Sequence, residues 1–273
     1  MSEPFTVTID GQEFTGQSGQ TIMEIARDNG INIPSLCDSP HLDSFGSCRM
    51  CIVEIDGRGG TPSSCTTPAN NGMVVSTTSD KLWRLRKGIT ELYVSEHPLD
   101  CLTCTANGDC ELQDVAADVG LRELRYDNEP ACENIPIDES NPFFSFDASK
   151  CIVCSRCIRA CDGIQATHAL SIDGRGYFSR IIAGVDEPFM TSDCVSCGAC
   201  VGECPVGALE DIVERSSGIP DNWVRTTCAF CGVGCQFDAG IKGNKLVIMK
   251  PVVDSPVNEG HSCVKGRFAS AYV

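Results

Sequence analysis

The sequence predicts an α+β chain built from several small modules rather than one domain with a single large core. The chain has 20 cysteines among 273 residues, and they fall in separate groups with short, recurring spacings. Strand-like and helix-like segments accompany these groups. Nothing in the sequence indicates an oxidising compartment, so cysteine-rich groups favour metal binding over disulfides. Metal ligation can replace core burial as the source of stability in modules this small.

The charge and hydropathy of the chain exclude several classes of partner. The formal net charge is −16, which argues against nucleic acid and anionic membrane surfaces as partners. Most of this acidity is expected to be ordinary solvated surface. The sequence has no signal peptide, no twin-arginine stretch and no long apolar run. We therefore expect a cytoplasmic protein without membrane association.

The segment from Cys151 to Cys204 contains the most specific pattern. The spacing C-x2-C-x2-C-x3-C occurs twice, and Pro205 follows the second copy. This run binds two [4Fe–4S] clusters, and the fourth cysteine of each half ligates the cluster of the other half. The alternatives are a disulfide framework and a zinc site, which usually takes two separated C-x2-C pairs. The expected ligand sets are Cys151, Cys154, Cys157 and Cys204 for one cluster, and Cys194, Cys197, Cys200 and Cys161 for the other.

We place this two-cluster ferredoxin domain, of the bacterial type, at residues 143–222, after an acidic, proline-containing connector at 121–142. It contains an insert at 162–193 with a strand-like segment at 178–182. A helix is expected over 207–214. The aromatic residues Phe143, Phe144 and Phe146 are expected to pack beneath this domain.

The N-terminal residues 1–79 read as a hairpin followed by a helix, as at the start of a β-grasp domain. Alternation predicts a strand over 5–9, Asp10-Gly11 predicts the turn, and a second strand returns over 13–15. Thr21 and Glu24 form a capping box that opens the helix, and Gly30 closes it. Four cysteines follow with the spacing C-x10-C-x2-C-x13-C: Cys37, Cys48, Cys51 and Cys65.

The flanks of these cysteines, residues 34–37 and 46–54, resemble the [2Fe–2S] domain at the start of the large iron–sulfur subunit of respiratory complex I. The resemblance implies a [2Fe–2S] cluster on the four cysteines, with zinc as the alternative.

A second module is expected at residues 80–120. Ser79 or Asp80 starts a helix whose apolar residues are Leu82, Leu85, Ile89 and Leu92. It leads to the pattern H-x3-C-x2-C-x5-C. This pattern resembles the [4Fe–4S] site of the same families in which one histidine joins three cysteines, and an imidazole in place of a thiolate should raise the potential. The implied ligands are His97, Cys101, Cys104 and Cys110.

The last module, residues 223–273, has the spacing C-x2-C-x3-C-x27-C, with strands expected over 237–241 and 246–249 and a turn over 242–245. It resembles the small, β-rich N-terminal [4Fe–4S] domain of molybdenum/tungsten bis-pterin oxidoreductases. In those families a lysine two residues after the fourth cysteine lies between cluster and pterin, and Lys265 matches it as an electron-relay residue, although a surface lysine is the alternative. The implied ligands are Cys228, Cys231, Cys235 and Cys263.

Four residues of potential chemical interest are left outside these sites. Cys132 lies in the connector without a partner motif and is expected to be a spare thiol. His41, His168 and His261 have no ligand pattern around them and are expected to be structural. No constellation for a general acid, base or nucleophile is present, so no catalytic residue is expected in this chain.

The order of the modules resembles the iron–sulfur portion of the α subunit of soluble NAD-dependent formate dehydrogenases. That family continues into a catalytic portion, whereas this chain stops ten residues after Cys263. We therefore expect the catalytic portion to be a separate subunit or this chain to be a fragment. One [2Fe–2S] and four [4Fe–4S] clusters predict about 18 iron atoms per chain.

The resemblance implies an electron-relay chain. Electrons from a partner with a Mo/W bis-pterin would enter at the cluster of the last module, cross the two-cluster domain and the His97 site, and leave to a flavin (FMN) and NAD-binding diaphorase subunit. The [2Fe–2S] cluster is either on that route or a side branch.

Three other functions remain open. A relay in an NAD-linked or electron-bifurcating hydrogenase shares the first three modules but lacks the fourth. A freely diffusing multi-cluster ferredoxin would run alone on purification, and a complex I subunit does not usually carry the double cysteine run.

Overall fold

The computed structural model describes residues 4–269, and these residues fall into two compact units. Unit 1 comprises residues up to 38 together with 43–96 and 111–129. Unit 2 comprises residues 39–42, 97–110 and those from 130 onward. Each unit is described by itself.

Unit 1 contains a four-stranded mixed sheet in the order β2-β1-β4-β3. The predicted hairpin is confirmed: Asp10 and Gly11 have φ values of 49° and 80°, which a two-residue hairpin turn requires. β1 pairs antiparallel with β2 and parallel with β4, and β3 pairs antiparallel with β4. The strands are β1 (Phe5–Ile9), β2 (Gln12–Gly16), β3 (Glu54–Ile55) and β4 (Val74–Ser76).

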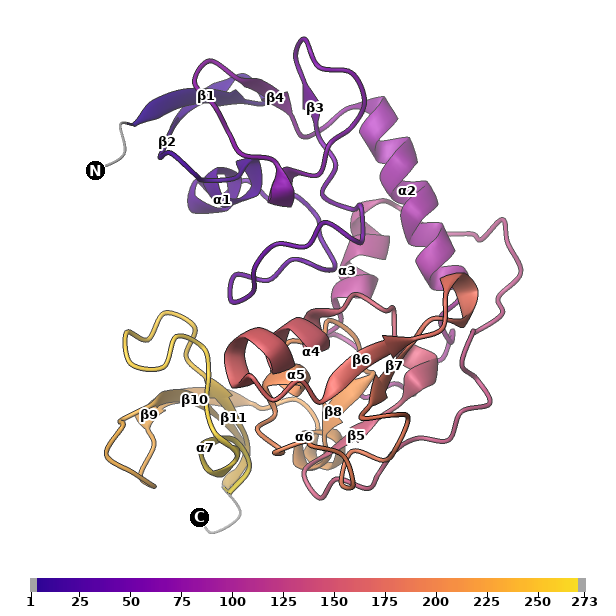
Figure 1. The fold of residues 1–273 in the computed structure, drawn as a ribbon, viewed down its shortest axis with the longest axis vertical. Helices are drawn as coiled ribbons and strands as arrows, with labels where there is room; N and C mark the ends of the chain where they lie inside the picture. Colours follow the sequence, from indigo (N-terminus) through magenta and orange to yellow (C-terminus); the bar gives the residue numbers. More distant parts are fainter. Residues whose placement is uncertain (1–3, 270–273) are drawn as a thin grey trace. The chain divides into compact units, whose positions relative to one another are not determined.

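Helix α1 (Ile22–Asp28) packs on this sheet (Figure 1). The predicted capping box is confirmed, because the Thr21 hydroxyl accepts a hydrogen bond from the Glu24 N–H and the Glu24 carboxylate accepts one from the Thr21 N–H. Val7, Ile9 and the apolar side of α1 form one buried core with Val53 and Val75. A 3-10 turn, η1 (Ser64–Thr66), carries Cys65 into that core.

The predicted second helix is α2 (Asp80–Ser95), and Ser79 caps its N-terminus by accepting a hydrogen bond from the Leu82 N–H. Its buried face differs from the apolar pattern in the sequence. Leu85 and Leu92 are 41% and 54% exposed, because polar side chains occupy the face that packs inward. A second short helix of unit 1, α3 (Glu111–Asp118), follows the cysteine-bearing loop. The buried residues of α2 are Leu82, Arg86, Thr90, Glu91 and Ser95.

In unit 2 a short antiparallel strand pair flanks the two cysteine runs: β5 (Phe144–Phe146) precedes the first run and β8 (Leu209–Asp211) follows the second. The helix expected over 207–214 is wrong at its start, since residues 209–211 hydrogen-bond to β5. Helix α6 (Ile212–Ser217) begins only after Asp211, which caps it. The other helical segments of this part are η2 (Ala148–Lys150), α4 (Arg156–Arg159), the π-helical turn η3 (Ala160–Gln165) and α5 (Ala199–Gly202).

The insert forms a hairpin of β6 (Leu170–Asp173) and β7 (Arg180–Ala183), with the 3-10 turn η4 (Gly176–Phe178) at its end. The strand predicted over 178–182 therefore starts two residues later. Phe144 and Phe146 are buried and contact Phe189 edge to face, at centroid distances of 5.2 and 5.8 Å. The prediction that these two phenylalanines pack in this domain is confirmed.

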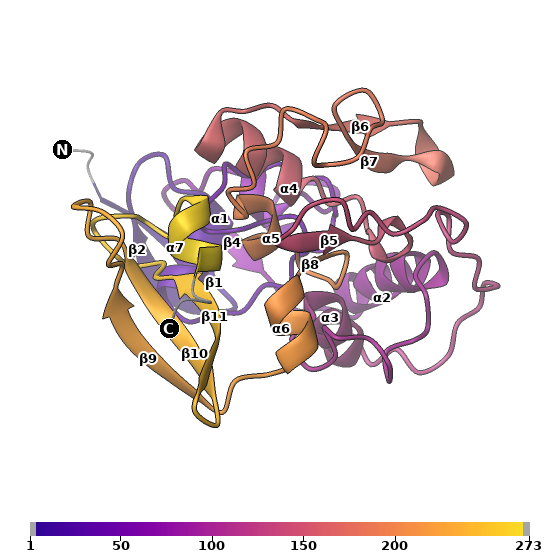
Figure 2. The ribbon, with the colours of Figure 1, turned by 90° about the horizontal axis from the view of Figure 1, so that it is seen from below.

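The last part of unit 2 is a three-stranded antiparallel sheet in the order β11-β10-β9, with helix α7 (Val264–Phe268) packed beside it (Figure 2). The two expected strands and their turn are confirmed as β10 (Gln236–Lys242) and β11 (Lys245–Pro251). The edge strand β9 (Asn222–Thr227) was not predicted, because all six of its residues are exposed and it has no alternating apolar pattern.

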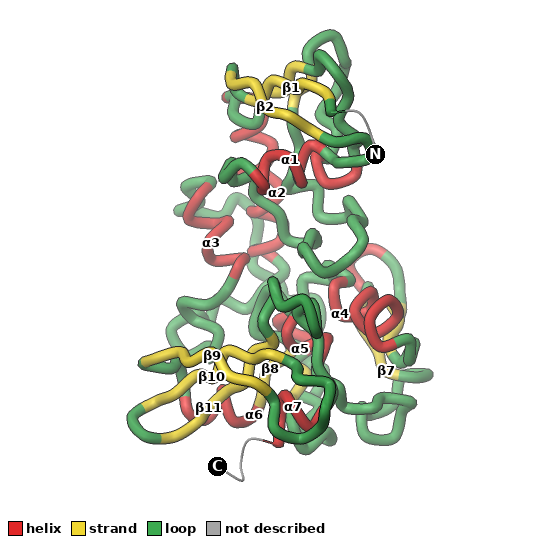
Figure 3. Tube along the Cα trace, turned by 90° about the vertical axis from the view of Figure 1, so that its left-hand side faces the viewer, coloured by secondary structure: helices red, strands yellow, loops and turns green. Residues whose placement is uncertain are grey.

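Loops and turns make up much of both units (Figure 3). Among residues 4–269, no helix is long and apolar enough to cross a bilayer.

Candidate iron–sulfur sites

The structure brings Cys37, Cys48, Cys51 and Cys65 of unit 1 together in two sulfur pairs. Sγ of Cys51 and Sγ of Cys65 lie 3.3 Å apart, and the Cys48 N–H donates to Sγ of Cys37 at 3.4 Å. A hydrogen bond from Cys48 lowers the pKa of the Cys37 thiol to about 5, and one from Cys65 lowers the pKa of Cys51 to about 7. The partner in each pair keeps its proton, since the hydrogen bond and burial raise the pKa of Cys48 and of Cys65. Two of the four sulfurs thus ionise readily, and the thiolate is the form that binds iron.

Arg86 supports this site from helix α2. The residue is 2% exposed, and its guanidinium donates to the carbonyl oxygens of Met50, Ile52 and Thr77 at 3.1, 2.7 and 2.9 Å. Residues 50 and 52 flank Cys51, so the guanidinium braces the ligand loop. The sequence analysis missed this residue, although its position one helical turn after Leu82 places it on the buried face of α2.

The two cysteine runs of unit 2 enclose two separate cavities, and each cavity takes its fourth cysteine from the other run. Cys161 lines one cavity together with Cys194, Cys197 and Cys200. The other walls of both cavities are mainly apolar. The second cavity is lined by Cys151, Cys154, Cys157 and Cys204.

The two ligand loops have the same backbone conformation, which reflects the internal repeat. Val153 and Ser196 occupy equivalent positions and have φ values of 51° and 55°. Each donates its N–H to the sulfur of the cysteine two residues earlier, at 3.4 Å in both loops. A β-branched residue at positive φ is strained, and such strain concentrates at functional sites. N–H···S bonds of this kind tune iron–sulfur centres.

These buried cysteines can ionise only if a cation compensates the charge of the thiolates. Desolvation raises the pKa of Cys157 and of Cys200 well above the ordinary value, and neighbouring cysteines add to the effect. Four thiolates gathered in a largely apolar cavity are therefore unfavourable without a cation. Iron supplies that charge, so these residues fit a thiolate-bound cluster.

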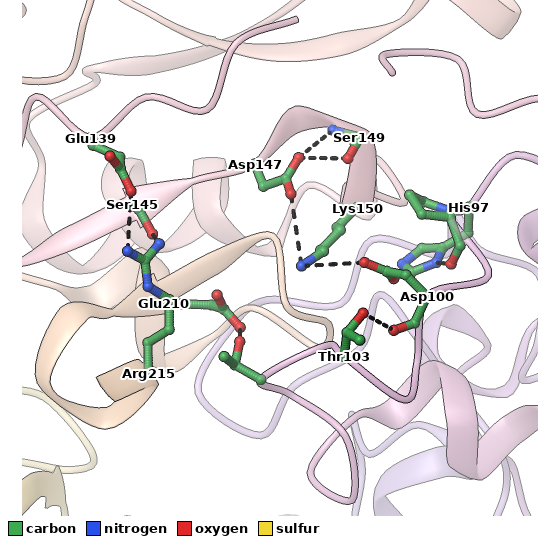
Figure 4. A network of polar contacts seen from close by, with 12 residues as sticks. His97, Asp100, Thr103, Glu139, Ser145, Asp147, Ser149, Lys150, Glu210 and Arg215 are labelled. Carbon is green, nitrogen blue, oxygen red and sulfur yellow. Dashed lines mark hydrogen bonds and ion pairs between the residues drawn. The ribbon is translucent and has the colours of Figure 1, made fainter. Parts of the chain in front are cut away.

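The His97 loop of unit 2 contacts the start of the first cysteine run through Lys150 (Figure 4). The Lys150 ammonium lies 4.0 Å from Oδ2 of Asp100 and 3.8 Å from Oδ2 of Asp147. Burial lowers the pKa of Lys150, but Cys104 and the surrounding carboxylates outweigh it and raise the pKa overall. A cation thus lies beside Cys104 and directly precedes Cys151.

His97 is oriented by the backbone of the next residue. Its Nδ1–H donates to the carbonyl oxygen of Pro98 at 2.9 Å, which leaves the lone pair of the neutral ring on Nε2. Desolvation lowers the pKa of the ring and favours this neutral form. A neutral imidazole with one nitrogen fixed by a carbonyl is the arrangement of a histidine that ligates a metal.

Gly207 permits the close approach of the His97 loop to the two-cluster domain. A Cβ at this position would lie 3.1 Å from Sγ of Cys104 and 3.1 Å from the Cβ of Ala106. Any larger residue would push the loop that carries Cys104 away from the segment following Cys204.

The four cysteines of the last module also come together. The Cys228 N–H donates to the Cys235 carbonyl at 2.8 Å. Desolvation raises the pKa of the Cys235 thiol, and the negative charges of Cys228, Cys231 and Cys263 raise it further. Cys231 and Cys263 are exposed, and so is Lys265. This site therefore lies at the surface of the described part of unit 2.

The remaining residues singled out in the sequence lie as follows. Cys132 is buried, at 8% exposure, and burial raises the pKa of its thiol. His168 is exposed and pairs with Asp162 at 3.0 Å. Nδ1 of His41 lies 2.8 Å from Oε1 of Glu203. The His261 ring packs edge to face against the His41 ring at a centroid distance of 5.7 Å.

Four known families match successive parts of the chain. Residues 2–80 match the family described as 2Fe-2S iron-sulfur cluster binding domain, and 86–125 match the NADH-ubiquinone oxidoreductase-G iron-sulfur binding region. Residues 150–208 match the 4Fe-4S dicluster domain, and 221–273 match the molybdopterin oxidoreductase Fe4S4 domain. Their order agrees with the order of modules read from the cysteine spacings.

Individual relatives share the whole chain at moderate identity. The NADPH-Fe(3+) oxidoreductase subunit alpha of Geobacter sulfurreducens is 35% identical over 272 residues, and an NADH-quinone oxidoreductase subunit of Rhizobium meliloti is 32% identical over 269. A formate dehydrogenase-like protein of Staphylococcus haemolyticus is 29% identical over 315 aligned positions. The chain covers 31% of the length of each of these relatives.

One solved structure, of an NAD+-reducing [NiFe]-hydrogenase in the H2-reduced state, contains a similar chain. The TM-score is 0.70 at 34% identity, and the match covers 76% of this chain and 87% of that chain. Likeness of this extent in both sequence and fold indicates common descent.

Proposed function

Because this chain belongs to the family of iron–sulfur electron-transfer modules that includes a chain of NAD+-reducing [NiFe]-hydrogenase, we propose that it is the electron-relay portion of an NAD-linked formate dehydrogenase. Formate oxidation to CO2 releases one proton and two electrons, and NAD+ takes up two electrons and one proton to form NADH. In this proposal a Mo/W-pterin centre and a flavin site on partner chains or portions perform the two half-reactions.

The chain itself would hold the clusters and set their surroundings. We propose a β-grasp [2Fe–2S] domain at 1–79, a one-His/three-Cys domain at 80–120, a connector at 121–142, a two-cluster domain at 143–222 and a pterin-enzyme-type domain at 223–273. The ligands are those of the sequence analysis, twenty side chains for about 18 iron atoms. When bound, the clusters supply one-electron steps, so the two electrons of each turnover pass singly.

The observation that carries this proposal is the pair of cavities with exchanged fourth cysteines. Cys161 joins the second run and Cys204 joins the first, as the two-cluster ligand rule requires. All four proposed [4Fe–4S] sites belong to unit 2. The choice of formate is supported by the match of 221–273 to the molybdopterin oxidoreductase domain and by the formate dehydrogenase-like relatives.

Protein groups would control each site by charge and solvent access. Half-buried backbone N–H groups donate to sulfurs of the two-cluster domain, and Lys150 lies beside the His97 loop. In the last module the exposed Lys265, Cys231 and Cys263 mark the face on which we expect the pterin portion, with Lys265 as the relay residue.

The test is to isolate the complex that contains this chain and measure its iron, acid-labile sulfide, molybdenum and tungsten. We expect about 18 iron atoms on this chain and benzyl viologen and NAD+ reduction with formate. Reduction with hydrogen and none with formate would refute the formate assignment.

A relay role in an NAD-linked hydrogenase is the second candidate. The likeness to the hydrogenase chain, with 87% of that chain covered, favours it. It predicts nickel rather than molybdenum or tungsten in the same preparation, together with hydrogen-dependent NAD+ reduction.

A further inference from the structure

Arg267 is a buried cation placed between two proposed cluster sites of unit 2. It lies on helix α7, four residues after Cys263, and is only 8% exposed. Its Nε is buried and has no hydrogen-bond partner among residues 4–269. A guanidinium so placed carries a desolvation cost that nearby negative charge must offset.

Two glycines let Arg267 approach helix α5, which carries Cys200. A Cβ at Gly202 would lie 2.9 Å from Nη1 of Arg267, and a Cβ at Gly198 would overlap the side chains of Arg267 and Phe268. Gly198 also has a φ of 75° and directly follows Cys197. The arginine side chain therefore lies directly against the segment that supplies two ligands of one cavity.

An aromatic contact holds the same helix in place. The Phe268 ring stacks on Phe143 with a centroid distance of 5.1 Å and an interplanar angle of 8°. Phe143 directly precedes β5, the strand that lies before the first cysteine run and pairs with β8. Helix α7, which begins after Cys263, is thus fixed against the neighbouring domain by Arg267 and Phe268 together.

The neighbours of Arg267 that are negative when ionised are the sulfurs of Cys200 and Cys197 and the carboxylates of Asp211 and Glu203. Both carboxylates already have other partners. Asp211 accepts the N–H groups of Val213 and Glu214 at 2.7 and 3.2 Å, and Glu203 contacts His41.

No carboxylate oxygen among the described residues forms an ion pair with Arg267. Asp211 and Glu203 thus direct their charge to other groups. The sulfurs of Cys197 and Cys200 are the remaining neighbours whose negative charge Arg267 can offset.

We propose that Arg267 is a positioning and potential-tuning residue for the cluster bound by Cys161, Cys194, Cys197 and Cys200. The proposal rests on the ligand assignment made above. Reduction adds one negative charge to a four-thiolate cluster, and a fixed cation stabilises that reduced form. Arg267 therefore raises the potential of this cluster. It also ties the cluster's ligand helix to the helix that follows Cys263.

The test compares R267M, which removes the charge, with R267K, which keeps it, in the complex that contains the chain. R225M is the matched control, because Arg225 lies in the same domain but is exposed and paired with Asp238 at 3.0 Å. Iron and acid-labile sulfide are measured first, and the clusters are then titrated by EPR spectroscopy at controlled potentials.

In R267M we expect about a tenfold lower ratio of reduced to oxidised cluster for one [4Fe–4S] signal at a fixed solution potential, about 59 mV for a one-electron couple. R267K should shift the signal less, and R225M should leave every signal in place.

Unchanged potentials in an iron-replete R267M protein would overturn the proposal. If R267M loses iron, R267Q takes its place and is judged by the same shift. Wild-type protein without acid-labile sulfide would instead refute the ligand assignment and the proposed function.

Discussion

Replacing Arg86 by methionine should destabilise unit 1 through the loop that carries Cys51. The guanidinium donates three hydrogen bonds to backbone carbonyls, those of Met50, Ile52 and Thr77. Methionine fills a similar volume but has no donor. The R86M variant therefore leaves three buried acceptors unsatisfied at the site where we propose the [2Fe–2S] cluster.

The size of the effect follows from two opposing contributions. A hydrogen bond to a charged group contributes about 1.5–3 kcal/mol, so three bonds amount to roughly 4–9 kcal/mol. Removing a buried cation returns several kcal/mol of desolvation cost, and burial does lower the pKa of Arg86. The net loss expected is about 3 kcal/mol, which at an m value of about 2 kcal/mol/M lowers the urea midpoint by roughly 1.5 M.

The assay is urea unfolding followed by the visible circular dichroism of the [2Fe–2S] centre and by far-ultraviolet circular dichroism. R84M is the control, since Arg84 lies on the same helix but is exposed. The R84M substitution should change the free energy of unfolding by less than about 0.5 kcal/mol. Equal midpoints for R86M and R84M would refute the reasoning.

Three further predictions concern other parts of the molecule. H97C adds a thiolate to the proposed one-His/three-Cys site and should lower the potential of that cluster by EPR titration; an unchanged potential would show that His97 is not a ligand. C132A should keep the iron content whereas C110A should lose about four irons, and iron loss in both would make Cys132 a ligand. Arg125 holds the pKa of Glu91 below its ordinary value of 4.5, so E91Q should be less stable than wild type at neutral pH, with a difference that shrinks as pH falls below that value; a difference in urea midpoint that does not change with pH would contradict this.

Local patterns predicted much of the fold correctly. The Asp10-Gly11 turn, the Thr21–Glu24 capping box and the Ser79 cap are set by residues within a few positions of one another, so the sequence contains all the information that they need. The turn between β10 and β11 was predicted for the same reason.

Segments whose state depends on distant partners were predicted less well. Residues 209–211 were expected to be helical, but they pair with β5, some 65 positions earlier in the chain. Leu85 and Leu92 were among the apolar residues noted in the predicted helix, yet both are exposed. Arg86 and Glu91 are the buried side chains. Their partners are backbone carbonyls and Arg125, which no periodicity in α2 reveals.

The cysteine spacings alone determined how the cysteines group along the chain, because residues of one short loop are necessarily close in space. They also predict which residues would bind each cluster. Only the tertiary structure decided which cations lie beside them. Arg86, Lys150 and Arg267 reach their sites from elements outside the ligand loops, and the charge they bring depends on packing and burial that no local motif records.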